Sequence, residues 1–96
     1  ALHARIREVG VLAMPTIAIS PPAIAELEND IEAWKAANVM TLRNTRLGNF
    51  LDCTALTLPC GKDDNGIPVG LMLVAPSGWE ERLLRMGSAL EPILSA

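Results

Sequence analysis

Apolar residues follow two different periods along the 96-residue chain, and these periods predict the elements of its fold. Residues 1–10 have apolar positions at helical spacing but no N-terminal cap, so we expect the end of a helix whose start is missing. Residues 11–19 are apolar at almost every position, which predicts a strand covered on both faces. Pro15 cannot donate a backbone hydrogen bond, so this strand should stop pairing near it, lie at an edge or carry a bulge.

Two helices are predicted in the middle of the chain. Ser20 and the two prolines after it are typical of a helix start, and apolar residues then recur at helical spacing beside a run of acidic side chains. We therefore expect residues 21–37 to form an acidic amphipathic helix whose charged face is solvated. Asn38 is expected to cap a second helix over residues 39–52.

Two arginines interrupt the apolar stripe of this second helix. Val39, Arg43, Arg46 and Phe50 project within about 60° of one another on a helical wheel. In the simplest interpretation, both guanidinium groups reach along the surface to solvent or pair with carboxylates of the rest of the protein. The alternative is that one of them lies near a substrate cleft.

A hairpin and a last helix are predicted towards the end. The Asn-Gly pair at residues 65–66 stands between two apolar runs, so residues 55–75 should form an antiparallel β-hairpin. Ser77, with Glu80 three residues later, favours a capping box before a terminal helix over residues 78–94. These helices cannot cover three strands that lack a polar face. The chain is therefore predicted to be part of an α/β fold that needs further strands and another layer.

Composition and charge narrow the functional classes. Half of the residues are apolar, but only 3% are aromatic. With a net charge of −3 and no basic stripe, the chain offers nucleic acid little to bind. No apolar run approaches the roughly 20 residues that a membrane helix needs, so neither a nucleic-acid nor a membrane partner is expected. Cys53 and Cys60 make no disulfide framework, which favours buried thiols in a reducing cytoplasm.

No pairing of a nucleophile with a base is convincing in this sequence. There is one histidine, His3, and no glycine-rich phosphate loop, so we expect no metal and no cofactor. Cys60 follows a predicted strand, where a nucleophile could lie, but His3 is at the opposite end of the chain, and Cys60 is interpreted as structural. Asp63 and Asp64 are interpreted as turn residues.

Residues 43–74 resemble the C-terminal segment of the amidase signature family. Members commonly have a helix ending in Asn-Leu/Phe-Leu, here residues 49–51, and a strand ending in Pro-x-Gly, here residues 59–61. A turn and the run Gly-Leu-Pro-Val-Gly-Leu-Gln-Leu follow in the family. In this chain Ile67 replaces the first leucine of that run and Met72 replaces the glutamine.

The resemblance extends over nearly the whole chain. Residues 12–16 are similar to a family strand that ends in Pro-Thr, and residues 79–94 are similar to the last helix, whereas the acidic segment falls in a variable region. This implies that residues 1–96 are a C-terminal fragment of one larger amidase domain. The strands would then belong to a mixed β-sheet covered by helices, within the amidase signature fold.

The resemblance also implies a reaction. The parent protein would hydrolyse carboxamide C–N bonds other than peptide bonds, with a Ser-Ser-Lys triad whose nucleophilic serine forms an acyl-enzyme. All three groups lie upstream in the family. Neither the serines of this chain nor Lys35 and Lys62 match their context, so the chain alone is expected to be inactive.

The role left for this segment is to complete the sheet and supply part of the pocket wall. Asn44 and Asn49 are the candidate substrate-binding residues, because family members often place polar side chains of this helix towards the cleft. Helix capping or packing is the other interpretation of both. The substrate of the parent is expected to be a small-molecule amide. Aliphatic amides, ureido acids and the glutaminase step of transfer-RNA amidation are all left open.

Two rival hypotheses come from other classes. The chain could be a stand-alone, non-catalytic module that oligomerises in its own right, although the uncapped helix at its start favours a fragment. It could also be a small hydrolase that uses Cys60 with His3 of another subunit. For a fragment and for a stand-alone module alike, we expect self-association through unpaired strand edges and apolar faces.

Overall fold

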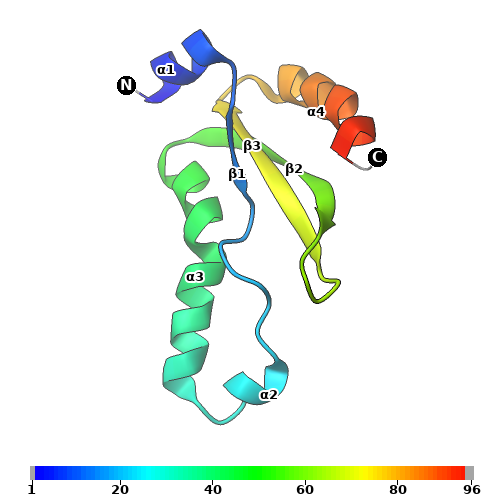
Figure 1. Ribbon diagram of the computed structural model, residues 1–96. Coiled ribbons are helices and arrows are strands. Elements are labelled where there is room, and N and C mark those ends of the chain that lie inside the picture. Colours follow the sequence, from blue (N-terminus) through cyan, green and yellow to red (C-terminus); the bar gives the residue numbers. More distant parts are fainter. Residues whose placement is uncertain (1, 95–96) are drawn as a thin grey trace.

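The computed structural model describes residues 2–94 and shows a three-stranded sheet with helices on both sides (Figure 1). In chain order the elements are α1 (Leu2–Val9), β1 (Leu12–Pro15), α2 (Ile24–Leu27), α3 (Ile31–Phe50), β2 (Cys53–Lys62), β3 (Pro68–Pro76) and α4 (Glu80–Leu94). The predicted α/β class is confirmed. The long helix α3 and the last helix α4 lie on opposite sides of the sheet (Figure 1).

The sheet is built around β3. The strand order is β1-β3-β2, and both pairings are antiparallel. β2 and β3 form a hairpin whose turn is closed by a hydrogen bond of 2.8 Å from Asp63 N to Ile67 O. Gly66 takes a φ of 80° in this turn, a conformation that glycine adopts without strain. The register shifts between Pro59 and Lys62, which is where a bulge interrupts the ladder.

One face of the sheet packs against α4. Leu58, Leu73 and Ala75 project from β2 and β3 and form a buried cluster with Leu83 of α4. Burial of such side chains is the main favourable contribution to folding, at roughly 25 cal/mol per Å² of apolar area. The alternation of the strands sends the intervening residues to the other face.

The second face packs against α1 and α3. Met72 and Val74 of β3 are buried there, and Ile6 of α1 is almost fully buried as well. Leucines from α1, β1 and the end of α3 line a small gap next to Val74. The sheet is therefore the middle of three layers.

β1 is shorter than the strand predicted over residues 11–19. Its last ladder pair is Pro15 with Leu71, and Thr16 N then donates to Gly70 O at 3.1 Å before the chain bends away. Bonded pairs alternate along an antiparallel ladder, and Thr16 is bonded to Gly70, so the nitrogen of Pro15 faces the free outer edge of β1. An edge position is one of the placements expected for this proline. The prediction that both faces are covered is not met within residues 2–94, since Ala13 and Pro15 are exposed.

The two predicted middle helices are wrong in their boundaries. The segment 21–37 does not form one helix, because the chain breaks after α2 and α3 begins at Ile31. Asp30 is the N-cap of α3, with its Oδ1 accepting from Ala33 N at 3.0 Å. Asn38, predicted to be a cap, lies inside α3, which runs through the predicted boundary at residue 39 and ends at Phe50.

The last helix begins two residues later than predicted. The expected capping box of Ser77 and Glu80 is not formed as proposed, because the Glu80 carboxylate accepts from Gly78 N at 3.3 Å. Gly78 has a φ of 96°, so the chain turns sharply there before α4 starts at Glu80. The residue predicted to start the helix therefore belongs to the turn.

The molecule is more open than a compact domain of its length. Its Cα radius of gyration is 15.4 Å, whereas a compact chain of this size has about 12.5 Å. Its accessible surface is 6620 Å², against roughly 5400 Å² expected for a compact monomer of this mass. The additional surface lies partly on α3, where no residue from Ile31 to Phe50 is buried.

Candidate functional site

The side of α3 that points away from the sheet combines apolar and basic residues. Val39 is 55% exposed and Phe50 is 86% exposed, and Arg43 and Arg46 are exposed between them. We call these four residues the outer face of α3. A phenylalanine with that exposure has lost the burial that makes it favourable in a folded protein. The outer face of α3 is therefore the strongest candidate surface in the described residues for contact with further protein or with a ligand.

Asn44 is turned towards the sheet. Its Nδ2 donates to Pro15 O at 2.7 Å, and its Oδ1 accepts from Arg43 Nε at 3.3 Å. The first bond satisfies the carbonyl at the end of β1, where the ladder stops. Asn44 therefore connects α3 to the end of β1, which is the packing role that the sequence left as the second interpretation.

Asn49 has a different environment. It is exposed, and five residues along a helix place it about 140° from Asn44. It lies three residues after Arg46, so it borders the outer face of α3. The structure does not bring the two candidate asparagines together, and their part in binding a substrate stays a prediction.

A small polar cluster lies beneath Asn44. Thr16 Oγ1 donates to Thr57 Oγ1 at 3.1 Å, and both threonines surround Gly70. A Cβ at Gly70 would stand 2.7 Å from Thr57 Cγ2, closer than real contacts allow, and 3.0 Å from Thr16 Oγ1, which is tighter than most. The end of β1 is thus held in place against β2, β3 and α3 at once.

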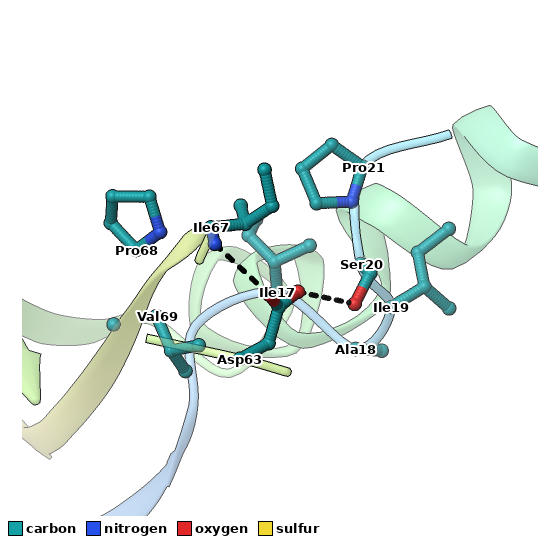
Figure 2. A pocket seen from close by; sticks show the side chains of 10 residues that line it. Ile17, Ala18, Ile19, Ser20, Pro21, Asp63, Ile67, Pro68 and Val69 are labelled. Atoms are coloured by element: carbon teal, nitrogen blue, oxygen red, sulfur yellow. Dashed lines mark hydrogen bonds between the residues drawn. The ribbon is translucent and has the colours of Figure 1, made fainter. Parts of the chain in front are cut away.

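A shallow pocket of about 270 Å³ lies between the segment after β1 and the β2–β3 turn, and Figure 2 shows Asp63 beside it. Asp63 Oδ1 accepts from Asn65 N at 2.8 Å and from Ile67 N at 2.9 Å, while Oδ2 accepts from Ser20 Oγ at 3.0 Å. The hydrogen bond from Ile67 is the main cause of a lowered pKa of the Asp63 carboxyl. Because both oxygens already accept hydrogen bonds within the chain, Asp63 acts as a turn residue, as the sequence indicated.

His3 and Cys53 are neighbours that sequence reasoning did not find. His3 Nε2 lies 2.8 Å from Leu51 O and 3.5 Å from Cys53 Sγ. The carbonyl only accepts, so this nitrogen donates to it and satisfies the last turn of α3. The two residues are 50 positions apart, and no local pattern could have predicted their contact.

This pair is not arranged as a nucleophile with its base. Burial and the nearby Asp52 carboxylate raise the pKa of the Cys53 thiol, which keeps it protonated at neutral pH. Within the described chain His3 contacts Cys53 and not Cys60. The thiol hydrolase hypothesis therefore has no support from the geometry of a single chain.

No cluster of three or more histidine, cysteine, aspartate or glutamate residues is close enough to hold a metal ion within residues 2–94. Among the described helices, none is both long and apolar enough to cross a membrane.

The three-layered α/β arrangement with open faces has relatives among known proteins. The model of the Amidase family matches residues 2–84. The chain is 38% identical over 87 residues to 2-amino-5-chloromuconic acid deaminase of Comamonas testosteroni, an alignment that covers 91% of this chain and 19% of that protein. It is 34% identical over 88 residues to a fatty acid amide hydrolase of Oryza sativa subsp. indica, which covers 91% of this chain and 14% of the relative.

A third relative is a glutamyl-tRNA(Gln) amidotransferase chain of Haloarcula marismortui. It is 36% identical over 83 residues, covering 86% of this chain and 19% of that protein. No solved structure gives a significant match. The chain belongs to the Amidase family, and it spans less than a fifth of the length of these relatives.

Proposed function

We propose that the chain is the C-terminal part of an amidase, which hydrolyses carboxamide C–N bonds other than peptide bonds. The family match over residues 2–84 carries this proposal. The chain is a small share of each relative, and its own groups form no catalytic arrangement in the described residues. The segment itself is therefore non-catalytic, and the nucleophile and base belong to the upstream part of the parent protein.

In this proposal the segment completes the sheet and forms part of the pocket wall. Support comes from the exposed outer face of α3 and from strands β1 and β2, each of which has an edge that no described strand pairs with. Asn49 borders that face, so it stays a candidate to contact substrate, whereas Asn44 would act by holding α3 against β1.

The proposed substrate class is a small-molecule amide. The relatives are named for an amino-substituted muconic acid, for fatty acid amides and for glutamyl-tRNA(Gln), so their names agree on no single substrate. The free thiols of Cys53 and Cys60 support a cytoplasmic location. We propose no nucleic-acid or membrane partner, and the net charge of −3 supports the first of these.

The test compares two proteins in one assay. The full-length protein that contains this segment and the 96-residue chain alone are incubated with a panel of aliphatic and aryl amides, and released ammonia is measured. We expect turnover by the full-length protein and none by the chain alone. Ammonia release by the chain alone would contradict the fragment hypothesis, and no release by the full-length protein would contradict the amidase.

Cysteine chemistry is tested in the same assay. Cys60→Ala in the full-length protein should leave kcat/KM within about twofold of the original value, because surface or packing substitutions away from the reacting atoms have small effects. Complete loss of turnover would restore the thiol hydrolase hypothesis, in which His3 of a second subunit serves as the base.

The second candidate function is a stand-alone module that oligomerises. The exposed apolar residues of α3 and the open strand edges favour it, because such surfaces associate with copies of the same chain. Sedimentation of the isolated chain measures its mass. Both the amidase segment and the stand-alone module are expected to self-associate. A well-defined oligomer therefore supports the module only if the full-length protein also lacks amidase activity.

A further inference from the structure

Arg43 and Arg46 are neighbours on the outer face of α3, because residues three apart lie on the same side of a helix. No acidic residue stands three or four positions from either of them. Within residues 2–94 neither guanidinium group has an ion pair. Three other basic side chains of the helices do have one, namely Arg5 with Glu8, Lys35 with Glu32 and Arg85 with Glu81, whereas Arg7 has none in this range and Arg82 lies over the ring of Trp79.

This pair is unfavourable as it stands. Two like charges at neighbouring helical positions repel each other, and an anion between them would remove that repulsion. The apolar side chains of Val39 and Phe50 flank the pair and are themselves exposed. Once further protein covers this face, the guanidinium groups enter apolar surroundings, where a charge without an anionic partner is strongly disfavoured.

One of the two arginine side chains has a hydrogen bond within the chain. Arg43 Nε donates to Asn44 Oδ1 at 3.3 Å, and Asn44 is bound to Pro15 O at 2.7 Å. The guanidinium group is thus connected to the end of β1, while its two Nη groups bond to nothing else in the described chain. Those two groups form the edge with which arginine binds a carboxylate through two parallel hydrogen bonds.

We infer that Arg43 and Arg46 bind a carboxylate of the substrate. This rests on the proposed function, and it restricts the substrate class to monoamides of dicarboxylic acids. The upstream nucleophile attacks the amide carbon, the C–N bond breaks and ammonia leaves with a proton from the base. Water then hydrolyses the acyl-enzyme, which releases the dicarboxylic acid and restores the nucleophile. The second carboxylate takes no part in the reaction. Its binding to the arginines would hold the amide group in position for the reaction. The amide group itself is uncharged and is present in every substrate, so it cannot supply that selectivity.

The experiment uses the full-length protein and matched pairs of amides. Malonamate, succinamate and glutaramate each carry a carboxylate where propanamide, butanamide and pentanamide carry a methyl group. We expect the wild type to prefer the anionic member of at least one pair. Arg46→Met and Arg43→Met should raise KM for that substrate by about 30-fold or more, as expected for removing one partner of a charged hydrogen-bonded pair, and should raise KM for the neutral amide far less.

Two further variants separate binding from general charge effects. Arg46→Lys keeps the charge but loses the two-pronged geometry, so its KM should fall between those of the wild type and Arg46→Met. Lys35→Met removes an exposed basic residue of the same helix, one that already pairs with Glu32. This variant should change KM for neither the anionic nor the neutral amide. An equal loss with anionic and neutral amides, accompanied by a lower Tm, would assign the arginines to structural ion pairs and overturn the inference.

A binding measurement does not depend on catalysis. Succinate should raise the Tm of the wild type, because a ligand that binds only the folded state stabilises it, and the rise should be lost in Arg46→Met. Absence of turnover with every amide would contradict the proposed function. The succinate measurement would then still decide the role of the arginines, and an unchanged Tm shift in both arginine variants would overturn it.

Discussion

Two glycines determine how closely neighbouring elements approach each other. A side chain at Gly87 of α4 would collide with Leu56 Cδ2 of β2, and one at Gly70 of β3 would collide with Thr57 Cγ2 of β2 and crowd Thr16, the residue after β1. Neither glycine has a positive φ, so space and not backbone conformation requires them. Gly48 of α3 has no atom within 4 Å of the place where a Cβ would lie, and it is under no such restriction in the described chain.

Gly87→Ala should therefore destabilise the protein by about 1 kcal/mol. Overpacking of a core position costs about 1 to 3 kcal/mol, and the better helix propensity of alanine offsets up to about 1 kcal/mol of it. Gly48→Ala keeps the propensity gain without the collision and should be neutral or stabilising. Chemical denaturation of both variants checks the difference, which should shrink when Leu56→Ala removes the colliding atoms.

Asp63 makes stability depend on pH. Its pKa is lowered in the folded state, chiefly by the hydrogen bond from Ile67 N, so the unfolded chain binds the proton more readily. The stabilisation is fully present above the ordinary aspartate pKa of about 3.9 and is lost as the pH falls through the lower folded value. Melting curves from about pH 7 to about pH 3, which span that pKa, should show a smaller acid-induced fall in Tm for Asp63→Asn. Asp64→Asn is the control, and equal behaviour of the two variants would contradict this role.

At the scale of the elements, short-range patterns predicted the turn and the strand end correctly, whereas the residue that caps α3 was not predicted. The Asn-Gly pair and the proline at residue 15 indicated the turn and the end of β1, because each restricts the backbone locally. Helical spacing of apolar residues continues from Ile24 to Trp34, so the pattern predicted one helix across Asp30 and a cap at Asn38. It could not reveal that the chain breaks after α2 and that Asp30 caps α3. The contact of His3 with Cys53 was equally beyond reach, because it depends on the packing of distant segments.

Asp30→Ala and Asn38→Ala test the boundary of α3. Removing the Asp30 cap should cost about 1 kcal/mol, because Ala33 N loses its acceptor. Asn38 is inside the helix, where alanine is the better helix former, so Asn38→Ala should be neutral or slightly stabilising. Thermal unfolding of both variants provides the comparison. A larger loss with Asn38→Ala would mean that the helix begins near residue 39 after all.

At the scale of the whole molecule, the open shape and the candidate site both follow from faces that the described residues leave uncovered. The sequence indicated that the strands need further cover, and the large radius of gyration and the bare faces of β1 and α3 agree with that. The arginines within an apolar stripe were visible on a helical wheel. What would cover them could not be predicted, because no part of residues 2–94 does so. The direction in which the Asn44 side chain points could likewise be learned only from the folded structure.

The largest effect should come from removing α4, because it alone covers one face of the described sheet. Deleting residues 79–96 from the full-length protein takes Leu83 away from Leu58, Leu73 and Ala75 and exposes that cluster to water. We expect an insoluble or unfolded product and not an enzyme of altered specificity. A soluble truncated protein that still hydrolyses amides would contradict this.

A milder substitution separates packing from the loss of a whole helix. Leu83 is 2% exposed, so Leu83→Ala should lower stability by about 2 to 5 kcal/mol through lost burial and the cavity that it leaves. Leu84 follows it on α4 but is 61% exposed, and Leu84→Ala removes the same atoms from a site that is open in this chain. If further parts of the proposed full-length protein also cover the outer side of α4, Leu84→Ala will destabilise that protein as well. The ratio of the two losses therefore measures how much of α4 the rest of the protein buries.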